Sequence, residues 1–99
     1  MSHKEIRFHP EARRELRAAV AFYEGEAAGL GRDLLQEVRA ALTRLADWPA
    51  SGTPDAADIR RVVLTRFPFT LVYQVLDDAL EIVAVMHQRQ RPGYWKDRT

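Results

Sequence analysis

Hydrophobic residues recur every three or four positions in two segments of the first half of the chain. The first segment runs from Pro10, which suits the opening turn of a helix, to about residue 24, and the second from about Leu30 to Asp47. The two apolar stripes are Ala12, Leu16, Ala19, Val20 and Tyr23, and then Leu34, Leu35, Val38, Ala41, Leu42 and Leu45. Because three glycines between residues 25 and 31 interrupt the periodicity, we predict a helical hairpin.

Strand patterns precede the first helix and fill the second half of the chain. Asp77 and Asp78 form a turn signal between the last two strands, whereas the serine, glycine and prolines within residues 49–57 predict an exposed loop. The predicted strands are residues 4–8, 59–64, 69–76 and 80–86. The last of them is almost wholly apolar, so we expect it to be central and covered on both faces.

The predicted order of elements is therefore β-α-α-β-β-β, which defines an α+β fold. The helical hairpin is expected to pack on one face of a small, mostly antiparallel four-stranded sheet. The last three strands form a meander because their connections are short. The first strand joins the sheet only after both helices, so we expect it at an edge, beside the last strand. A chain of 99 residues is expected to form a single domain, residues 1–99.

Composition and charge narrow the classes of function. The net charge of +1 argues against a protein that coats nucleic acid nonspecifically, and the absence of cysteine excludes disulfide and thiolate chemistry. The longest apolar runs, such as residues 82–86, are too short to cross a bilayer, and the first ten residues carry charges throughout. We therefore expect a soluble, cytoplasmic protein with no membrane partner.

Neither a cofactor nor a metal site is predicted. His3, His9 and His87 show no ligand spacing among themselves. The glycines between residues 25 and 31 lack the lysine and the following hydroxyl residue that complete a phosphate-binding loop. We also expect no small-molecule substrate.

Two motifs in the second half of the chain carry a family resemblance. Residues 60–64 read Arg-Arg-Val-Val-Leu and are followed by Arg-Phe-Pro-Phe at 66–69. Residues 83–95 read Val-Ala-Val-Met-His-Gln-Arg-Gln-Arg-Pro-Gly-Tyr-Trp. With these motifs and this order of elements, the chain resembles the RelE/ParE toxin superfamily over nearly its whole length. It resembles the ParE-like branch in particular. The tail of ParE-like members commonly reads Ala-Val-x-His-x-Arg-Arg-x-Pro-x-Tyr-Trp, whereas here Gln90 stands where a second arginine is usual, next to Arg91.

The resemblance implies the toxin of a type II toxin–antitoxin pair, which arrests growth and is neutralised by a cognate antitoxin. ParE-like members inhibit DNA gyrase, whereas RelE-like members cut messenger RNA on the ribosome. A non-toxic binding module of the same fold is the third interpretation.

A ribonuclease needs a clamp for the developing phosphate charge and a general acid or base. Arg61, or Arg60 beside it, is the candidate for the clamp, His87 for the acid or base, and Arg89 for a second clamp, with Tyr94 nearby. The helix and loop regions around this set contain no lysine, and a net charge of +1 gives weak steering toward a ribosome. We therefore favour gyrase inhibition without catalysis and keep ribosome-dependent cleavage as the alternative.

The favoured hypothesis predicts two sets of contact residues. Arg60 and Arg61 point to opposite faces of one strand, so at most one lines a given site, and the other is expected to pair with an acid such as Asp58 or Glu81.

An antitoxin is expected to add a strand at a sheet edge or to lay a helix on the hairpin. The predicted target contacts are Arg60, Arg61, Arg89, Arg91, Tyr94 and Trp95. The predicted antitoxin contacts are Arg13, Arg14, Arg17, Tyr23 and Arg39, which suit an acidic segment that folds on binding.

Each candidate also has a structural interpretation. His87 fits a hydrogen-bonded residue at a strand end, and Tyr94 and Trp95 fit anchors that tie the tail to the core. Trp48 is predicted to cap the core after the second helix, and Met86 to belong to the core. The helix arginines also fit a solvated helix face on which acidic residues are their local ion-pair partners: Glu11, Glu15 and Glu37. The arginines of the tail fit a solvated segment: Arg89, Arg91 and Arg98.

Overall fold

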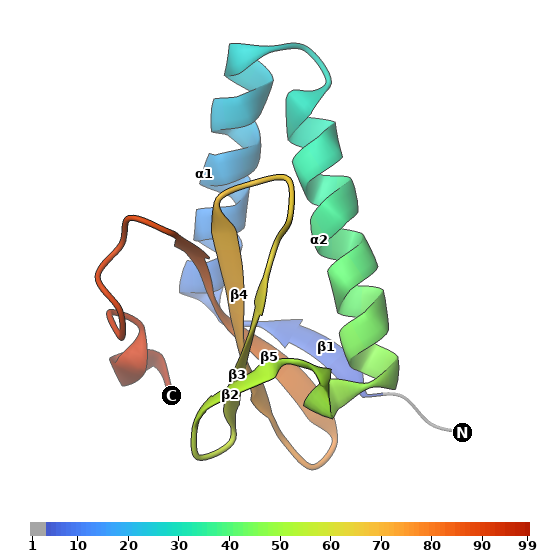
Figure 1. The fold of residues 1–99 in the computed structure, drawn as a ribbon, viewed down its shortest axis with the longest axis vertical. Helices are drawn as coiled ribbons and strands as arrows, with labels where there is room; N and C mark the ends of the chain where they lie inside the picture. Colours follow the sequence, from blue (N-terminus) through green and yellow to red (C-terminus); the bar gives the residue numbers. More distant parts are fainter. Residues whose placement is uncertain (1–3) are drawn as a thin grey trace.

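Figure 1 shows two antiparallel helices that rise side by side from a twisted sheet, in a computed structural model that describes residues 4–99. His3 lies outside the described residues. The helices are α1, Pro10–Glu26, and α2, Leu30–Asp47. The strands β1 to β5 are Glu5–Phe8, Thr53–Ala56, Ile59–Val63, Phe69–Val75 and Ala79–His87. There are also two short 3-10 helices. The first, η1 at Pro49–Ser51, follows α2, and the second, η2 at Lys96–Arg98, lies near the C-terminus.

Local capping explains where the helices begin. The Nδ1 atom of His9 accepts a hydrogen bond from the Glu11 N–H at 3.1 Å and so caps α1. Gly29 precedes α2 with a φ of 88°, a left-handed conformation that glycine adopts without steric cost. The Glu24 carboxylate accepts hydrogen bonds from the N–H groups of Gly29 at 2.9 Å and Gly31 at 3.1 Å. The end of α1 therefore caps the start of α2, and the predicted helical hairpin is confirmed.

The five strands form one sheet in the order β1-β5-β4-β3-β2. β3, β4 and β5 form the predicted antiparallel meander. β1 runs parallel to β5, with Glu5 opposite Ala79 and Phe8 opposite Ile82. The first strand thus lies at an edge beside the last strand, as the order of elements predicted.

The prediction of four strands was wrong by one. Residues 49–57, expected to be an exposed loop, contain η1 and the edge strand β2. Thr53 pairs with Arg61 and Pro54 with Arg60, while all four β2 residues remain exposed. A strand held only by backbone pairing at a solvated edge has no buried face, so it shows no alternation of apolar residues.

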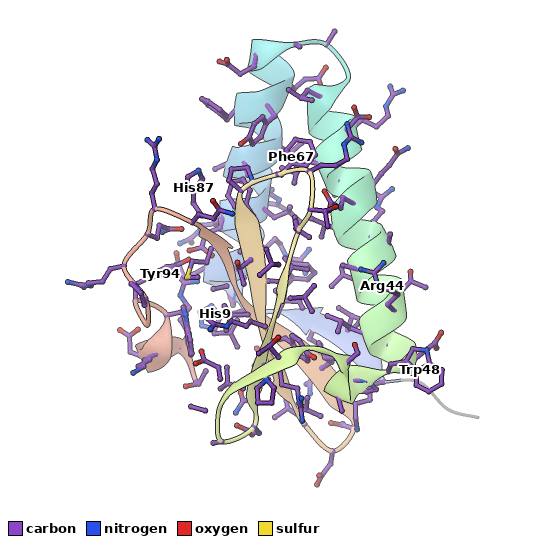
Figure 2. All side chains as sticks on the ribbon, in the orientation of Figure 1. His9, Arg44, Trp48, Phe67, His87 and Tyr94 are labelled. Carbon is purple, nitrogen blue, oxygen red and sulfur yellow. The ribbon has the colours of Figure 1, made fainter. Side chains whose placement is uncertain are left out.

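The helical hairpin covers one face of the sheet and forms the main core. Fully buried residues of α2 (Leu34, Val38, Ala41 and Leu45) and Ala12 of α1 pack against Leu71, Tyr73, Leu80, Ile82 and Val85 of the sheet. Figure 1 shows the turn between β3 and β4 reaching up between the two helices. In Figure 2, Phe67 lies at that turn, and its side chain is 6% exposed.

A second, smaller core lies on the opposite face of the sheet. Trp95, from the C-terminal tail, packs there against Val72, Val83 and Ala84. The register of β4 and β5 shifts so that Val72 faces Ala84 and Tyr73 faces Ile82, which leaves Val83 as an extra residue. The residues from Ile82 to Val85 are each at most 1% exposed, so the prediction that β5 is covered on both faces is confirmed.

Two expectations about side chains were wrong. Trp48 does not cap the core: it is 65% exposed and points away from the end of α2 in Figure 2. Arg60 pairs with no acid within residues 4–99; its guanidinium donates instead to the carbonyl oxygens of Ala50 at 3.0 Å and Gly52 at 2.8 Å. Tyr73 holds the same loop through its hydroxyl, which donates to the Pro49 carbonyl at 2.7 Å.

Glu37 of α2 holds the turn between β3 and β4. Its carboxylate accepts hydrogen bonds from the Thr65 N–H at 2.7 Å, the Thr65 hydroxyl at 2.9 Å and the Arg66 N–H at 3.3 Å. Burial of the carboxyl opposes ionisation, but these donors outweigh it, so the pKa of Glu37 lies below its ordinary value. The turn is therefore anchored by a charge that acid removes.

We expect Glu37→Gln to lower the free energy of unfolding by about 1 kcal/mol at pH 7, less than for fully buried charged hydrogen bonds because the site is partly solvated. A lowered pKa in the folded state stabilises above the unfolded pKa, and that stabilisation is lost as pH falls through the folded pKa. Urea unfolding should therefore show the difference between the two proteins shrinking below about pH 4.5, the ordinary pKa of a glutamate. A difference that stays constant down to pH 3, or an equal loss in Glu26→Gln, would contradict this role.

Candidate functional site

The C-terminal tail, residues 88–99, folds back onto the edge of the sheet and is clamped there by Glu15 of α1. The Glu15 carboxylate accepts from the Tyr94 hydroxyl at 2.7 Å and from two nitrogens of Arg98 at 2.9 and 3.1 Å. The Arg98 guanidinium also lies 5.0 Å from the centre of the Tyr94 ring. The side chains of Glu15 and Arg98 are only 20% and 14% exposed. This group, called the Glu15 cluster below, is a partly buried bidentate ion pair rather than a surface contact.

The Glu15 cluster also covers a strand edge. β1 ends at Phe8, opposite Ile82, so the outer edge of β5 has no partner among the described strands beyond that point. The Val85 N–H donates to Glu15 at 2.9 Å, and the Val83 carbonyl accepts from Arg98 at 3.0 Å. Farther along, the His87 N–H donates to the Gln90 side chain at 2.8 Å. Side chains of α1 and the tail thus satisfy backbone groups that a neighbouring strand would otherwise pair with.

Basic residues are concentrated in the tail. It contains four of the chain's fifteen lysines and arginines and one of its fourteen acids, so it carries a charge of +3 in a chain whose total is +1. Arg98 is neutralised by Glu15. Arg89, Arg91 and Lys96 are exposed, and among residues 4–99 no acid lies within ion-pair distance of them. The tail therefore presents uncompensated positive charge at the surface.

An apolar groove lies beside the tail, between α1 and the ends of β4 and β5. This α1 groove has a volume of about 390 Å³ and is lined by Glu15, Ala18, Ala19, Phe22, Tyr23, Phe69, Val85, His87 and Gln90. Phe22 stands at its rim with 59% of its surface exposed, and its ring makes an edge contact with Tyr23 at 5.1 Å. An exposed aromatic residue beside a preformed apolar groove is typical of a protein-binding site.

The residues proposed for RNA cleavage are not brought together. His87 packs edge-on against Phe69 at 5.1 Å and lines the α1 groove, on the helix side of the sheet. Arg61 lies on the opposite face, where it lines a small cleft of about 150 Å³ with Val72 and Trp95. The sheet therefore separates the candidate phosphate clamp from the candidate acid or base.

Tyr94 and His87 both have partners that fit structural roles. Burial and the hydrogen bond to Glu15 raise the pKa of Tyr94 well above its ordinary value, so this phenol holds its proton. The Nδ1 atom of His87 accepts from the Arg89 N–H at 3.0 Å at the end of β5. Trp95 is 4% exposed, which makes it an anchor of the tail rather than a surface that a partner can contact. Met86 is half-buried against the same core.

The residues predicted to contact an antitoxin lie on two different surfaces. Arg13, Arg14, Arg17 and Arg39 are exposed on the helical hairpin. Tyr23 is half-buried and faces the α1 groove instead. Within residues 4–99, only Arg14 has the local helix partner that the alternative interpretation required, in Glu11. Glu15 and Glu37 bond to the tail and to the β3–β4 turn, so their expected role as local partners was wrong.

Four residues of the site were not predicted from the sequence: Glu15, Arg98, Gln90 and Phe22. Phe22 could have been noticed, because it falls outside the apolar stripe of α1. Nothing local marks Glu15 or Arg98, because their contact depends on a tail 83 residues away folding back. Among the residues that the structure describes, no cluster of three potential metal ligands occurs, and no helix is long and apolar enough to span a membrane.

Comparisons with known proteins identify the family of this chain. Residues 6–92 match the family described as the ParE toxin of the type II toxin–antitoxin system, parDE. The chain is 33% identical over 92 residues to the protein named "Putative toxin Y4kP" from Sinorhizobium fredii (strain NBRC 101917 / NGR234), covering 92% of this chain and 95% of that protein. A chain from a solved structure, "Chromosomal ParDE TA system from P. aeruginosa", superposes with a TM-score of 0.74 over 86% of this chain and 96% of that one. At 17% identity, this second likeness shows a shared fold.

Proposed function

The chain belongs to the ParE toxin family of type II toxin–antitoxin systems, and on that premise we propose that it arrests growth by inhibiting DNA gyrase in the cytoplasm. The observation that carries the proposal is the anchored basic tail. Arg89 and Arg91 are exposed on a segment whose ends are fixed by His87 in β5 and by the Glu15 cluster. A preorganised pair of arginines binds an anionic partner with little loss of conformational entropy.

Binding without catalysis fits the arrangement of the other candidates. An acid–base reaction needs its groups within hydrogen-bond reach of one substrate. Arg61 and His87 lie on opposite faces of the sheet, and Tyr94 retains its proton. These observations favour a gyrase inhibitor over a ribosome-dependent ribonuclease.

We further propose that a cognate antitoxin neutralises the protein through the α1 groove and the neighbouring helix arginines. The groove offers an apolar surface with Phe22 at its rim, and Arg14 and Arg17 lie on the exposed side of the same helix. An amphipathic helix with an acidic flank matches this combination. A disordered segment that folds on binding suits a surface that joins an apolar groove to exposed arginines.

The test is expression of this chain alone in a bacterium, followed by expression with its antitoxin. We expect growth arrest with filamentation and a DNA-damage response while translation continues, and we expect the purified protein to inhibit gyrase supercoiling. Co-expressed antitoxin should restore growth. Early loss of translation with cleaved messages would replace gyrase with the ribosome as the target. The absence of any arrest would identify a non-toxic binding module.

A further inference from the structure

Glu15 joins three parts of the molecule that are far apart in the sequence: α1, the free edge of β5 and the end of the tail. Its two carboxylate oxygens accept four hydrogen bonds, from Val85, from Tyr94 and twice from Arg98. A carboxylate that accepts four hydrogen bonds at a partly buried site differs from an exposed ion pair, which contributes little to stability. Glu11, one turn earlier on α1, provides that contrast, because it pairs with the exposed Arg14.

The other attachments of the tail lie near its two ends. It leaves β5 at His87, where the Gln90 side chain accepts from the backbone, and it returns to the sheet at Trp95 and Arg98. The loop that carries Arg89 and Arg91 is thus closed at both ends. Removing the Glu15 carboxylate would release the far end while leaving α1 and the sheet in place.

We propose that Glu15 is a positioning residue, which fixes the loop carrying Arg89 and Arg91 in the conformation that contacts the target. This inference rests on the proposed function, because the target contact is part of it. Glu15 itself is only 20% exposed and faces the tail, so it acts through Tyr94 and Arg98 rather than by touching the target. The expected consequence of breaking the contact between Glu15 and the tail is a loss of gyrase inhibition.

The two tryptophans allow the tail to be observed directly. Trp95 is buried where the tail packs against the sheet, whereas Trp48 is 65% exposed. In a Trp48→Phe background, fluorescence therefore reports only on Trp95. We expect Glu15→Gln in this background to shift the emission to longer wavelength and to increase iodide quenching severalfold, while the circular dichroism of the helices is retained. Glu11→Gln is the matched control and should change neither signal.

The same variants are then compared in supercoiling inhibition. We expect Glu15→Gln to weaken gyrase inhibition about tenfold or more, because a mobile loop must be ordered on binding. Antitoxin affinity is compared in Arg98→Met, because Glu15 lines the α1 groove and Arg98 does not, and it should change by less than about twofold. Arg98→Met breaks the same contact from the tail and serves as a second variant if Glu15→Gln does not fold. The double variant should be no weaker than either single variant, since both remove one contact.

Three results would overturn the proposal. Trp95 that stays shielded in both Glu15→Gln and Arg98→Met would show that other contacts hold the tail. A released tail with undiminished inhibition would show that its position does not matter to the target. If the unaltered protein does not inhibit gyrase, the proposed target and the positioning role toward it both fail, while the fluorescence of Glu15→Gln still shows whether this residue holds the tail.

Discussion

Replacing Arg89 and Arg91 together with glutamate is expected to abolish gyrase inhibition, with a loss of at least about 100-fold, while the fold is unchanged. Both side chains are exposed, so their replacement removes no core contact. Like charges brought face to face across an interface cost several kcal/mol, and each 1.4 kcal/mol is a factor of ten in affinity. Supercoiling assays with purified protein, accompanied by thermal unfolding, provide the measurement. If the variant unfolds within about 2 °C of the unfolding temperature of the unaltered protein, the loss of inhibition comes from the lost target contact and not from unfolding.

A crossed control distinguishes a specific contact from the effect of bulk charge. Arg13→Glu with Arg17→Glu changes the net charge by the same amount on the exposed side of α1. We expect this pair to weaken antitoxin binding about tenfold or more and to leave gyrase inhibition nearly unchanged. Equal loss of inhibition in both double variants would instead indicate general electrostatic steering, and the tail would no longer be the target contact.

The second large effect concerns Gly31, at the crossing of the two helices. Gly31→Ala is expected to lower the free energy of unfolding by about 2 kcal/mol, although alanine favours a helix over glycine by up to about 1 kcal/mol. A Cβ atom at this position would lie 2.6 Å from the Val20 carbonyl oxygen and 3.0 Å from the Glu24 Cβ. The first of these atoms is backbone and cannot rotate away, so the helices must separate, which disturbs the cap that Glu24 provides.

Gly25→Ala is the matched substitution in the same hairpin. Gly25 lies inside α1, and a Cβ atom added there would meet no described atom within 4 Å apart from its chain neighbours and the adjacent backbone of its own helix. The helix propensity therefore acts alone, so alanine should stabilise the protein by up to about 1 kcal/mol. Urea unfolding of the two variants should give shifts of opposite sign. A stabilised Gly31→Ala protein would show that the hairpin relaxes at no cost.

The sequence by itself determined the elements whose residues carry a periodic pattern. The stripe of leucines in α2 predicted its bounds, Leu30–Asp47, because a helix that packs on a core must place an apolar residue on one face every third or fourth position. The short connections between β3, β4 and β5 fixed their antiparallel order. The family motif in residues 83–95 identified the kind of protein for a different reason, since it depends on resemblance and not on periodicity.

Only the tertiary structure decided the details of the candidate site. Every residue of β2 is exposed, so no pattern of apolar residues could reveal this strand. Trp48 is exposed, although a large apolar side chain at the end of a helix was expected to cap the core. The separation of Arg61 from His87 follows from the register of the sheet. Arg61 pairs with Val72 and His87 with Phe69, three residues apart on β4, so the two side chains point to opposite faces. The contact between Glu15 and Arg98 exists because the tail returns to a strand edge that β1 is too short to cover. Periodicity reports which residues are buried, whereas the choice of partners across the chain depends on how the packed elements meet.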